Sequence, residues 1–449
     1  MNNQHAVAGL TSHRAGPLIG TISVPGDKSI SIRSLLFGAL ALDMTEIAGL
    51  LEGEDVLMTA GALRALGVPI DKSGDRWVVR GVGVGGFSEP TVDLDFGNSG
   101  TGSRLVMGAI AGNAITARIV GDASLSKRPM GRVLKPLIDM GLIVTPAGAE
   151  RFPLTLAGTL DLMPTTYRLP VASAQVKSAI MIAGLHASGV TTVIEPEPTR
   201  DHTERMLRAF GVEVDVRTDP SDGARHISVR GRQTLRGQTV HVPRDPSSAA
   251  FPVVAAILVP GSDVTIEGVL VNPTRVGLYL TLQDMGADLT FANARVEGGE
   301  PVADIRVRSS QLRGVEVPAE RAPTMIDEYP ILSIAAAFAS GTTTMNGLAE
   351  LKVKESDRLA ATADGLVANG IDARVDADRL LVTGMRDVPG GGLVETHLDH
   401  RIAMAFLVLG LASQRAVAVS DASPIATSFP TFRALFEEMG ARFTDGDGR

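Results

Sequence analysis

Hydrophobic and polar residues along the chain predict two kinds of helix. Segments such as "SAIMIAGL" (178–185), "AFPVVAAIL" (250–258) and "IAMAFLVLGL" (402–411) are apolar on every side. A helix that is apolar all round lies inside a protein, so each segment is expected to be a buried helix. Other segments combine apolar and polar residues at helical spacing, end at a glycine and continue as a strand.

This second pattern recurs six times along the chain. It is seen in "ALRALGVPI", "LKPLIDMGLIV", "MLRAFGVEVDV", "LTLQDMGADLT", "GLVANGIDARV" and "LFEEMGARF", whose glycines are Gly67, Gly141, Gly211, Gly286, Gly370 and Gly440. A glycine directly after a helix adopts the left-handed conformation that ends it. Successive glycines are 70 to 84 residues apart. The pattern therefore predicts six repeats of about 75 residues each.

Each repeat also contains an earlier helix start, where Asp, Asn or Ser precedes an apolar segment. These starts lie near Asp27, Asn98, Ser173, Asp245, Asp327 and Asp399. Such side chains cap helices by accepting hydrogen bonds from free N–H groups. Each repeat is therefore expected to contain a strand, a cap, a buried helix, further strands, an amphipathic helix, a glycine and a strand.

The repeats are expected to form two groups of three. "VPGDKSISIRSLLFGALAL" (24–42) and "VPRDPSSAAFPVVAAIL" (242–258) resemble each other at a separation of 218 residues, as two equivalent entries into two domains would. We expect an α/β protein with one domain at 28–241 and another at 1–27 plus 242–449, which includes the N-terminal strand. Ligand sites favour domain boundaries, so the active site is expected between the domains.

Composition narrows the class of function. The 449 residues include no cysteine, which excludes disulfides, thiolate metal sites and cysteine nucleophiles. A net charge of −8 and an aromatic content of 4% argue against nucleic acid as a partner. The apolar segments are too short to span a membrane, and the first residues do not resemble a signal peptide. A cytoplasmic protein is expected.

Cations gather in or near the helix starts of this acidic chain. They are Lys28, Arg33, Arg128, Arg200, Lys354, Arg358 and Arg401. Helix N-termini bind anions through free N–H groups, so the combination indicates substrates that carry several phosphates or carboxylates. Any one of these cations alone could be an ordinary surface residue. Asp327 and Glu355 are candidate proton carriers, although simple helix capping would also explain Asp327.

Seven motifs in order resemble those of the 5-enolpyruvylshikimate-3-phosphate (EPSP) synthase family. They are "GDKSISIR", "DFGNSGTGSRL", "GDASLSKRPMGR", "ASAQVKSA", "IDEYP", "KESDRL" and "HLDHRIAM", and the similarity extends from about Gly20 to Phe432. "FGNSGTG" and "SAQVKSA" are similar to the bacterial subgroup called class II. The resemblance implies a fold of two domains, each with three βαβαββ units, which agrees with the six repeats.

The resemblance also implies a reaction. The 5-hydroxyl of shikimate 3-phosphate attacks C2 of phosphoenolpyruvate, protonation at C3 gives a tetrahedral intermediate, and this intermediate loses inorganic phosphate. Asp327 would be the base on the 5-hydroxyl, and Glu355 would carry the proton to C3. Lys28 would contact both substrates and act as an acid. No metal or organic cofactor is required, and a monomer is expected.

The substrate contacts that the resemblance implies form two sets. Shikimate 3-phosphate would be held by Lys28, Ser29, Arg33, Ser173, Ala174, Gln175, Arg200, Asp327 and Lys354. Phosphoenolpyruvate would be held by Lys28, Gly100, Thr101, Arg128, Gln175, Arg358 and Arg401. Forked guanidinium groups suit carboxylates and phosphates better than an ammonium does.

Some positions depart from the family pattern or vary within it. Ile32 replaces a usual Asn or His, which costs a polar contact if the side chain faces the cleft and little if it packs within its helix. Thr427 stands where many relatives carry a lysine that contacts phosphoenolpyruvate. Gly100 leaves room for the inhibitor glyphosate and favours sensitivity, whereas Leu105 favours the opposite.

Other interpretations have weaker support. "GVGVGG" (81–86) is not followed by a helix, so a turn is expected there and not a dinucleotide site. "VPGDKS" lacks the first glycine of a phosphate-binding P-loop. His397, Asp399 and His400 lack a third histidine or a cysteine at metal-ligand spacing.

Three rival functions remain to be compared. A UDP-amino-sugar enolpyruvyl transferase shares the repeat but usually employs a cysteine. The RNA 3′-phosphate cyclase group would need a nucleotide site, a catalytic histidine and a basic surface. A catalytically inactive protein of the same fold would bind shikimate 3-phosphate without releasing phosphate.

Overall fold

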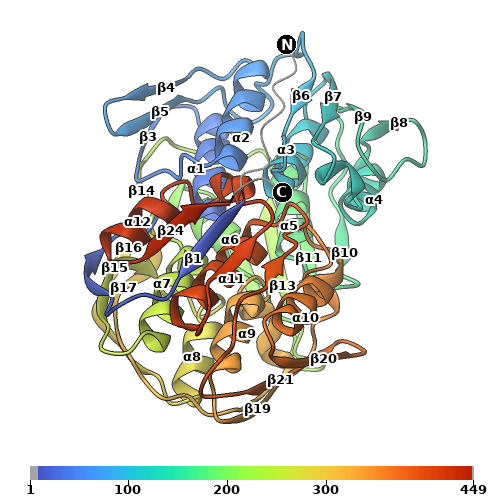
Figure 1. Cartoon of the computed structure of the whole chain (residues 1–449). Helices are drawn as coiled ribbons and strands as arrows, with labels where there is room; N and C mark the ends of the chain where they lie inside the picture. Colours follow the sequence, from blue (N-terminus) through green and yellow to red (C-terminus); the bar gives the residue numbers. More distant parts are fainter. Residues whose placement is uncertain (1–8, 447–449) are drawn as a thin grey trace. The chain divides into compact units, whose positions relative to one another are not determined.

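The computed structural model describes residues 9–446 (Figure 1). These residues form two compact units, each with its own hydrophobic core. Unit 2 consists of Gly26–Pro243 and Val296–Glu300. Unit 1 takes the rest of the described chain, which is residues 9–25, 244–295 and 301–446. The chain therefore starts in unit 1, passes through unit 2 and returns. The prediction of a two-domain α/β fold is confirmed.

Unit 2 contains three repeats of strands and helices. Its elements are α1 (Lys28–Leu40), β3 (Met44–Ala48), α2 (Glu54–Ala65), β4 (Ile70–Ser73), β5 (Arg76–Arg80), β6 (Leu94–Asp95), α3 (Gly100–Ala111), β7 (Thr116–Val120), α4 (Gly131–Met140), β8 (Ile143–Thr145), β9 (Leu154–Ala157), β10 (Thr166–Arg168), α5 (Ala174–Gly184), β11 (Val190–Glu195), α6 (His202–Ala209), β12 (Val214–Thr218), β13 (Arg225–Arg230) and β14 (Thr239–His241).

The sheets of unit 2 share one topology. Their strand orders are β6-β7-β9-β8, β10-β11-β13-β12 and β14-β3-β5-β4. The first two strands of each sheet are parallel and the remaining pairs are antiparallel. β14 is the last strand in the main segment of this unit, yet it is the edge strand of the sheet that contains β3, β5 and β4. The end of the main segment therefore completes the sheet that its first strands form.

Unit 1 repeats this plan. Its elements are β1 (Leu10–His13), β2 (Ile19–Ile22), α7 (Pro246–Leu258), β15 (Asp263–Leu270), α8 (Gly277–Asp284), β16 (Asp288–Glu297), β17 (Glu300–Arg308), β18 (Glu316–Val317), α9 (Tyr329–Ala337), β19 (Gly341–Met345), α10 (Arg358–Ala368), β20 (Asp372–Asp376), β21 (Arg379–Gly384), β22 (Leu393–Val394), α11 (His400–Ala412), β23 (Val417–Val419), α12 (Phe432–Glu438) and β24 (Arg442–Asp445). The tip of the β16–β17 hairpin, Val296–Glu300, belongs to unit 2.

Two N-terminal strands, and not the single one expected, enter the sheets of unit 1. The sheet orders are β18-β19-β21-β20, β16-β17-β15-β2 and β22-β23-β1-β24. β2 pairs with β15 in parallel, with Ile22 opposite Ile266. β1 lies between β23 and β24, where Thr11 is opposite Ala418 and Thr444, and in Figure 1 the blue β1 runs beside the red β24. The expectation of a single N-terminal strand was wrong, because residues 14–18 are not in a strand and separate β1 from β2, which joins a different sheet.

The predicted helix ends are confirmed. The φ angles of Gly67, Gly141, Gly211, Gly286, Gly370 and Gly440 are 87°, 123°, 86°, 99°, 79° and 107°. These values lie in the region that only glycine adopts without strain. Helices α1, α3, α5, α7, α9 and α11 are the apolar ones, and nearly all of their residues are buried in the two cores.

Five of the six predicted helix starts have an Asp or Ser side chain as the cap, and the start of α9 does not. Asp27, Ser173, Asp245 and Asp399 accept hydrogen bonds from backbone N–H groups of their helices. Ser99 caps α3 in place of Asn98, whose amide donates to Asp122 at 2.7 Å. Glu328 takes the cap position of α9 in place of Asp327, because Asp327 is held by two cations described below.

Two other expectations concern segments away from the helix starts. "GVGVGG" forms a loop with a turn at Val84–Gly85 and opens no helix, as predicted. Among the helices described, none has the length and hydrophobicity needed to cross a membrane.

Candidate active site

Lys28 is the first residue of α1 and forms a buried ion pair. Its Nζ lies 2.8 Å from Oδ2 of Asp55 in α2, and the side chains are 16% and 9% exposed. Asp27 caps the same helix by accepting from the N–H of Ile30 at 2.7 Å. The cap fixes where the helix begins, and Asp55 fixes the direction of the ammonium. Lys28 is thereby presented, partly exposed, at a helix N-terminus.

Arg33 lies one turn further along α1 and faces inward. Its Nε donates to Thr203 Oγ1 at 2.8 Å, its Nη2 to Ser178 Oγ at 2.9 Å and its Nη1 to the carbonyl of Ser29 at 3.0 Å. Burial lowers the pKa of Arg33 to about 10, and the positive charge of Arg200 also lowers it. Arg33 remains charged at neutral pH and ties α1 to α5 and α6.

The N-terminal turn of α5 contains three predicted residues. Ser173 caps the helix, and Ala174 is its first residue. The side chain of Gln175 donates from Nε2 to Thr101 Oγ1 at 2.9 Å and accepts a short hydrogen bond from Arg104. Gln175 therefore joins the start of α5 to the start of α3.

Gly100 begins α3 beside two guanidinium groups. A Cβ at this position would lie 2.9 Å from Nη1 of Arg128 and 3.5 Å from Nη1 of Arg104. Arg128 follows the 3-10 turn Leu125–Lys127 and donates a short hydrogen bond to Asn98. The absence of a side chain at Gly100 thus leaves room beside both guanidinium groups.

Unit 1 contains a second cluster, which is centred on Arg358, the first residue of α10. Its guanidinium lies 2.7 Å from Asp399, 3.2 Å from Asp327 and 2.6 Å from Glu355, and the side chain is 1% exposed. Lys354 Nζ lies 3.3 Å from Asp327. Burial alone would lower the pKa of Arg358, but the three carboxylates outweigh it and raise the pKa well above its ordinary value.

Arg401, the second residue of α11, adjoins this cluster. Its Nη1 donates to the backbone carbonyl of Asp327 at 3.3 Å and lies 3.8 Å from Oε1 of Glu328. The backbone N–H of Arg401 donates to Asp399 at 2.9 Å. Asp399 therefore acts twice, as the cap of α11 and as a partner of Arg358.

Each unit brings its own predicted residues together. In unit 2 they lie at the starts of α1, α3 and α5 and in the loops before α4 and α6, as Lys28, Ser29, Arg33, Gly100, Thr101, Arg128, Ser173, Ala174, Gln175 and Arg200. In unit 1 they are Asp327, Lys354, Glu355, Arg358 and Arg401. Sequence reasoning missed Asp55 and Arg104. Arg104 stands inside the quoted motif "DFGNSGTGSRL", whereas no local signal marks Asp55.

Ile32 and Thr427, which depart from the family pattern, both make contacts within the protein. Ile32 is fully buried in the core of unit 2, so it packs within the protein as in the second of the two alternatives considered above. The hydroxyl of Thr427 donates to the carbonyl of Pro424 at 2.7 Å and lies 3.4 Å from Nδ1 of His400.

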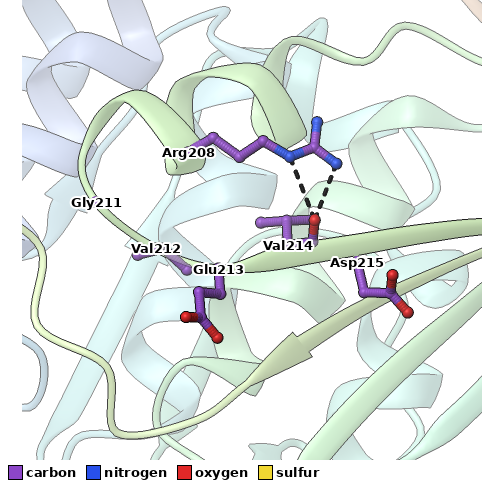
Figure 2. A pocket seen from close by; sticks show the side chains of 6 residues that line it. All are labelled: Arg208, Gly211, Val212, Glu213, Val214 and Asp215. Atoms are coloured by element: carbon purple, nitrogen blue, oxygen red, sulfur yellow. Dashed lines mark hydrogen bonds between the residues drawn. The ribbon is translucent and has the colours of Figure 1, made fainter.

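A surface hollow of about 490 Å³ lies at the end of α6, away from the predicted residues. Arg208 crosses it and donates from Nε and Nη2 to the carbonyl of Val214 at 3.2 and 2.9 Å (Figure 2). Its remaining lining residues are Gly211, Val212, Glu213 and Asp215. Arg208 thus fastens the helix to the following strand, and we assign no chemistry to this hollow.

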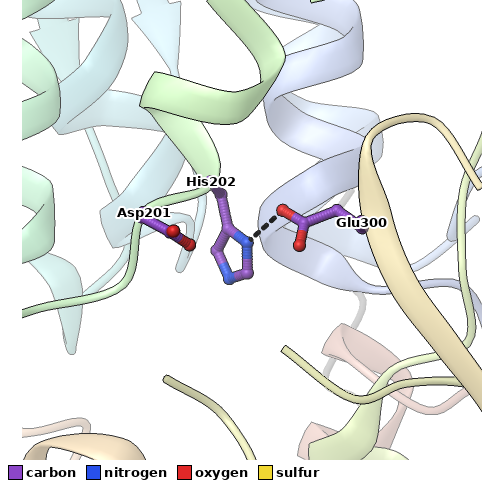
Figure 3. Close-up of side chains that lie close together, drawn as sticks. All are labelled: Asp201, His202 and Glu300. Atoms are coloured by element: carbon purple, nitrogen blue, oxygen red, sulfur yellow. Dashed lines mark hydrogen bonds and ion pairs between the residues drawn. The ribbon is translucent and has the colours of Figure 1, made fainter. Parts of the chain in front are cut away.

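A cluster with metal-ligand geometry lies at the start of α6. Asp201, His202 and Glu300 bring three possible ligand atoms within 4.8 Å of one another, and Figure 3 shows the imidazole facing Glu300. The His202 Nδ1–Glu300 Oε1 distance is 2.8 Å. The guanidinium of Arg205 lies 2.8 Å from Asp201 and 3.8 Å from Glu300. The guanidinium of Arg205 therefore lies near both carboxylates, and we interpret the cluster as an ion-pair network.

Known proteins share this sequence and this fold. The family model described as EPSP synthase (3-phosphoshikimate 1-carboxyvinyltransferase) matches residues 13–436. A 3-phosphoshikimate 1-carboxyvinyltransferase of Parvibaculum lavamentivorans is 58% identical over 443 residues, covering 98% of each chain. One from Chelativorans sp. is 60% identical over 439 residues, covering 97% of this chain and 98% of the relative.

Solved structures agree with the sequence comparisons. An EPSP synthase structure from Acinetobacter baumannii is 44% identical to this chain, with a TM-score of 0.86. The match covers 98% of this chain and 100% of that one. The similarity therefore includes both units and all the predicted residues.

Proposed function

The chain belongs to the EPSP synthase family, and we propose that the two polar clusters described above share the chemistry of that family. As a 3-phosphoshikimate 1-carboxyvinyltransferase, the protein transfers the enolpyruvyl group of phosphoenolpyruvate to the 5-hydroxyl of shikimate 3-phosphate. The products are 5-enolpyruvylshikimate 3-phosphate and inorganic phosphate, on the shikimate pathway to chorismate and the aromatic amino acids.

One observation carries the assignment of roles. Helices α1, α3, α5 and α10 begin at Lys28, Gly100, Ala174 and Arg358, which are all proposed substrate contacts. A helix N-terminus offers free N–H groups and a partial positive charge. The two substrates together carry two phosphates and two carboxylates, so anion-binding helix ends that coincide with cations fit this substrate pair.

Shikimate 3-phosphate is held mainly by unit 2. Ser29, Ser173, Ala174 and Gln175 line its ring and carboxylate, and Arg200 meets its phosphate. Arg33, whose guanidinium is nearly fully buried, supplies positive charge from beneath the site. From unit 1, Asp327 and Lys354 complete the set.

Phosphoenolpyruvate is held by guanidinium groups of both units. Arg128 binds it beside the backbone of Gly100 and Thr101, and Gln175 and Lys28 are shared between the substrates. Arg358 and Arg401 bind it from unit 1. The Arg358 guanidinium forms ion pairs with three carboxylates, so when the substrate binds, it replaces some of these ion pairs.

Two carboxylates and one ammonium move the protons. Asp327, which lies beside Lys354 and Arg358, accepts the proton of the 5-hydroxyl. Glu355 carries the proton to C3, and Lys28 acts as an acid on the substrate side. No metal or organic cofactor enters this scheme.

We further propose that the two units correspond to the two catalytic domains and act on one substrate pair. The protein works as a cytoplasmic monomer, without nucleic acid or membrane partners, and belongs to the class II subgroup of its family. An acidic net charge of −8 supports the exclusion of nucleic acid.

The test is phosphate release from phosphoenolpyruvate plus shikimate 3-phosphate, with each substrate omitted in turn. Release that requires both substrates supports the transferase. Saturable binding of shikimate 3-phosphate without release would instead support a binding protein. A parallel assay with glyphosate compares wild type with Gly100→Ala, whose methyl group would lie 2.9 Å from Arg128 Nη1. We propose that the wild type is inhibited and that the variant is inhibited less.

A further inference from the structure

Lys177 is a fully buried cation that the proposed mechanism does not use. It lies in α5, two residues after Gln175. Its Nζ lies 2.9 Å from Oε1 of Glu195 and 2.8 Å from Oε1 of Glu204, and all three side chains are at most 1% exposed. Buried ions lose their hydration, and apolar residues often replace them without loss of stability. Stability alone is therefore a weak reason for this arrangement.

The two carboxylates stand on either side of the loop that carries Arg200. Glu195 is the last residue of β11, and Glu204 lies in the first turn of α6. Within the loop, the hydroxyl of Thr199 donates a short hydrogen bond to Glu195. One ammonium thus holds both ends of the loop at residues 196–201 against α5.

The charges of the network are nearly balanced. Two carboxylates face the single ammonium of Lys177, and Arg225 Nη1 lies 3.5 Å from Oε2 of Glu195. Removing Lys177 alone would take away the ammonium that contacts both buried carboxylates and leave the group with one more negative charge. Removing Lys177 and neutralising Glu204 together would restore the net charge of the group.

Direct neighbours of the triad hold Arg33. Ser178 follows Lys177 and Thr203 precedes Glu204, and both hydroxyls accept hydrogen bonds from the Arg33 guanidinium at 2.9 and 2.8 Å. Helices α5 and α6 are therefore joined twice, once through Lys177 and once through Arg33. The network sits directly behind the residues assigned to shikimate 3-phosphate.

We propose that Lys177 is a positioning residue for shikimate 3-phosphate. By binding Glu195 and Glu204, it sets the distance between the N-terminal turn of α5, which holds the ring and carboxylate, and Arg200, which meets the phosphate. Lys177 itself does not touch the substrate. This inference rests on the proposed function, since it needs the substrate contacts of Gln175 and Arg200.

The experiment compares three variants with wild type by steady-state kinetics, thermal unfolding and calorimetric binding of shikimate 3-phosphate. Lys177→Met removes the ammonium, and Lys177→Met with Glu204→Gln also restores the net charge. Val229→Ala, in the fully buried core of the same sheet, is the control for lost stability.

Lys177→Met should unfold at a lower temperature, and the double variant should recover most of this loss. Both should raise KM for shikimate 3-phosphate and weaken its binding by about tenfold or more, because small misplacements of binding groups are costly. The KM for phosphoenolpyruvate should change by less than about threefold. Val229→Ala should be less stable but have unchanged KM values.

A double variant with wild-type affinity for shikimate 3-phosphate would overturn the inference, because Lys177 would then only balance charge. Equal increases in both KM values would also overturn it. If neither variant folds, Thr199→Val removes one loop contact and must still weaken shikimate 3-phosphate selectively. A wild type that binds shikimate 3-phosphate but releases no phosphate would contradict the proposed function, while the calorimetric comparison would still decide the role of Lys177.

Discussion

Asp327 is a single residue on which the proposed chemistry depends. Its carboxylate lies 3.3 Å from Lys354 and 3.2 Å from Arg358, so its charge serves these contacts as well as proton transfer. In Asp327→Asn, the amide keeps the shape but cannot accept the proton. We expect turnover to fall by about 10²- to 10⁴-fold, the usual contribution of a general base.

Binding distinguishes the base role from a structural one. Calorimetry should show an affinity of Asp327→Asn for shikimate 3-phosphate within about threefold of wild type. Matching losses in binding and turnover would instead place Asp327 among the residues that only hold the substrate or the Arg358 network.

At the residue scale, the sequence indicated individual side chains of the candidate site but not the residues with which they form ion pairs. Lys28, Arg128, Arg358 and Arg401 could be found because cations at helix starts are unusual in an acidic chain. Asp55 could not, because its importance comes from a helix packing that joins residues 27 positions apart. Asp327 was assigned to a cap for a local reason, and contacts with Lys354 and Arg358 in the chain's next segment override that assignment.

The glycines that end the amphipathic helices give a prediction at the scale of the element. Gly211 has a φ of 86° and Gly61 lies inside α2, and a Cβ on either would meet no atom within 4 Å. The two positions therefore differ in backbone conformation and not in available space. Gly211→Ala should destabilise the protein by about 1–2 kcal/mol, the cost of left-handed backbone.

Gly61→Ala is the matched control and should stabilise by about 0.5–1 kcal/mol, because alanine favours a helix interior. Chemical denaturation of both variants measures the difference. Equal effects of the two substitutions would mean that the left-handed cap carries no strain for alanine.

His186, just beyond the C-terminal end of α5, gives a pH-dependent prediction for the contact between α5 and α3. Burial lowers the pKa of His186 to about 4, and a backbone hydrogen bond with Gly112 opposes this only in part. The unfolded chain therefore binds a proton at a higher pH than the folded one. Neutral His186 therefore contributes to the free energy of unfolding above pH 6.5, and this contribution is lost as the pH falls towards 4.

Between pH 6.5 and 5, this single group should reduce the free energy of unfolding by about 1.5 kcal/mol. Chemical denaturation of wild type and His186→Gln at several pH values isolates the effect. All other groups that take up protons at low pH are present in both proteins, so their effect on the free energy of unfolding cancels. Parallel pH profiles for the two proteins would show that His186 is protonated equally in the folded and unfolded states.

At the element scale, the sequence predicted the repeats well because their signals are local. A glycine after an amphipathic helix and an acidic or hydroxyl cap before an apolar one need only neighbouring residues. Strand partners were harder, since β14 completes the sheet of β3 and β2 that of β15 across about 200 residues or more. Such pairings depend on chain topology, which periodicity does not encode.

The described residues pack around two separate cores, and β1 contributes Leu10 to one of them. Thr11 lies in the middle of a sheet, opposite Ala418 and Thr444. Thr11→Pro removes a backbone donor where both sides of the strand are paired. We expect faster hydrogen exchange in peptides of residues 393–445 and unchanged exchange in residues 44–230 of unit 2, measured by mass spectrometry. Uniformly faster exchange would show that the two cores unfold as one.

The placement of β1 and β2 also has a consequence during synthesis of the chain on the ribosome. The three sheets of unit 2 are built from strands within residues 44–241, so these sheets can form before the hairpin tip Val296–Glu300 emerges. The strand at Leu10–His13 emerges before the strands with which it pairs, and the later of these ends at Asp445. At about 5–20 residues per second, the nascent strand waits roughly 20 to 90 seconds with both edges unpaired. A strand that is translated before its partners by more than 400 residues is thus among the last parts of unit 1 to pair.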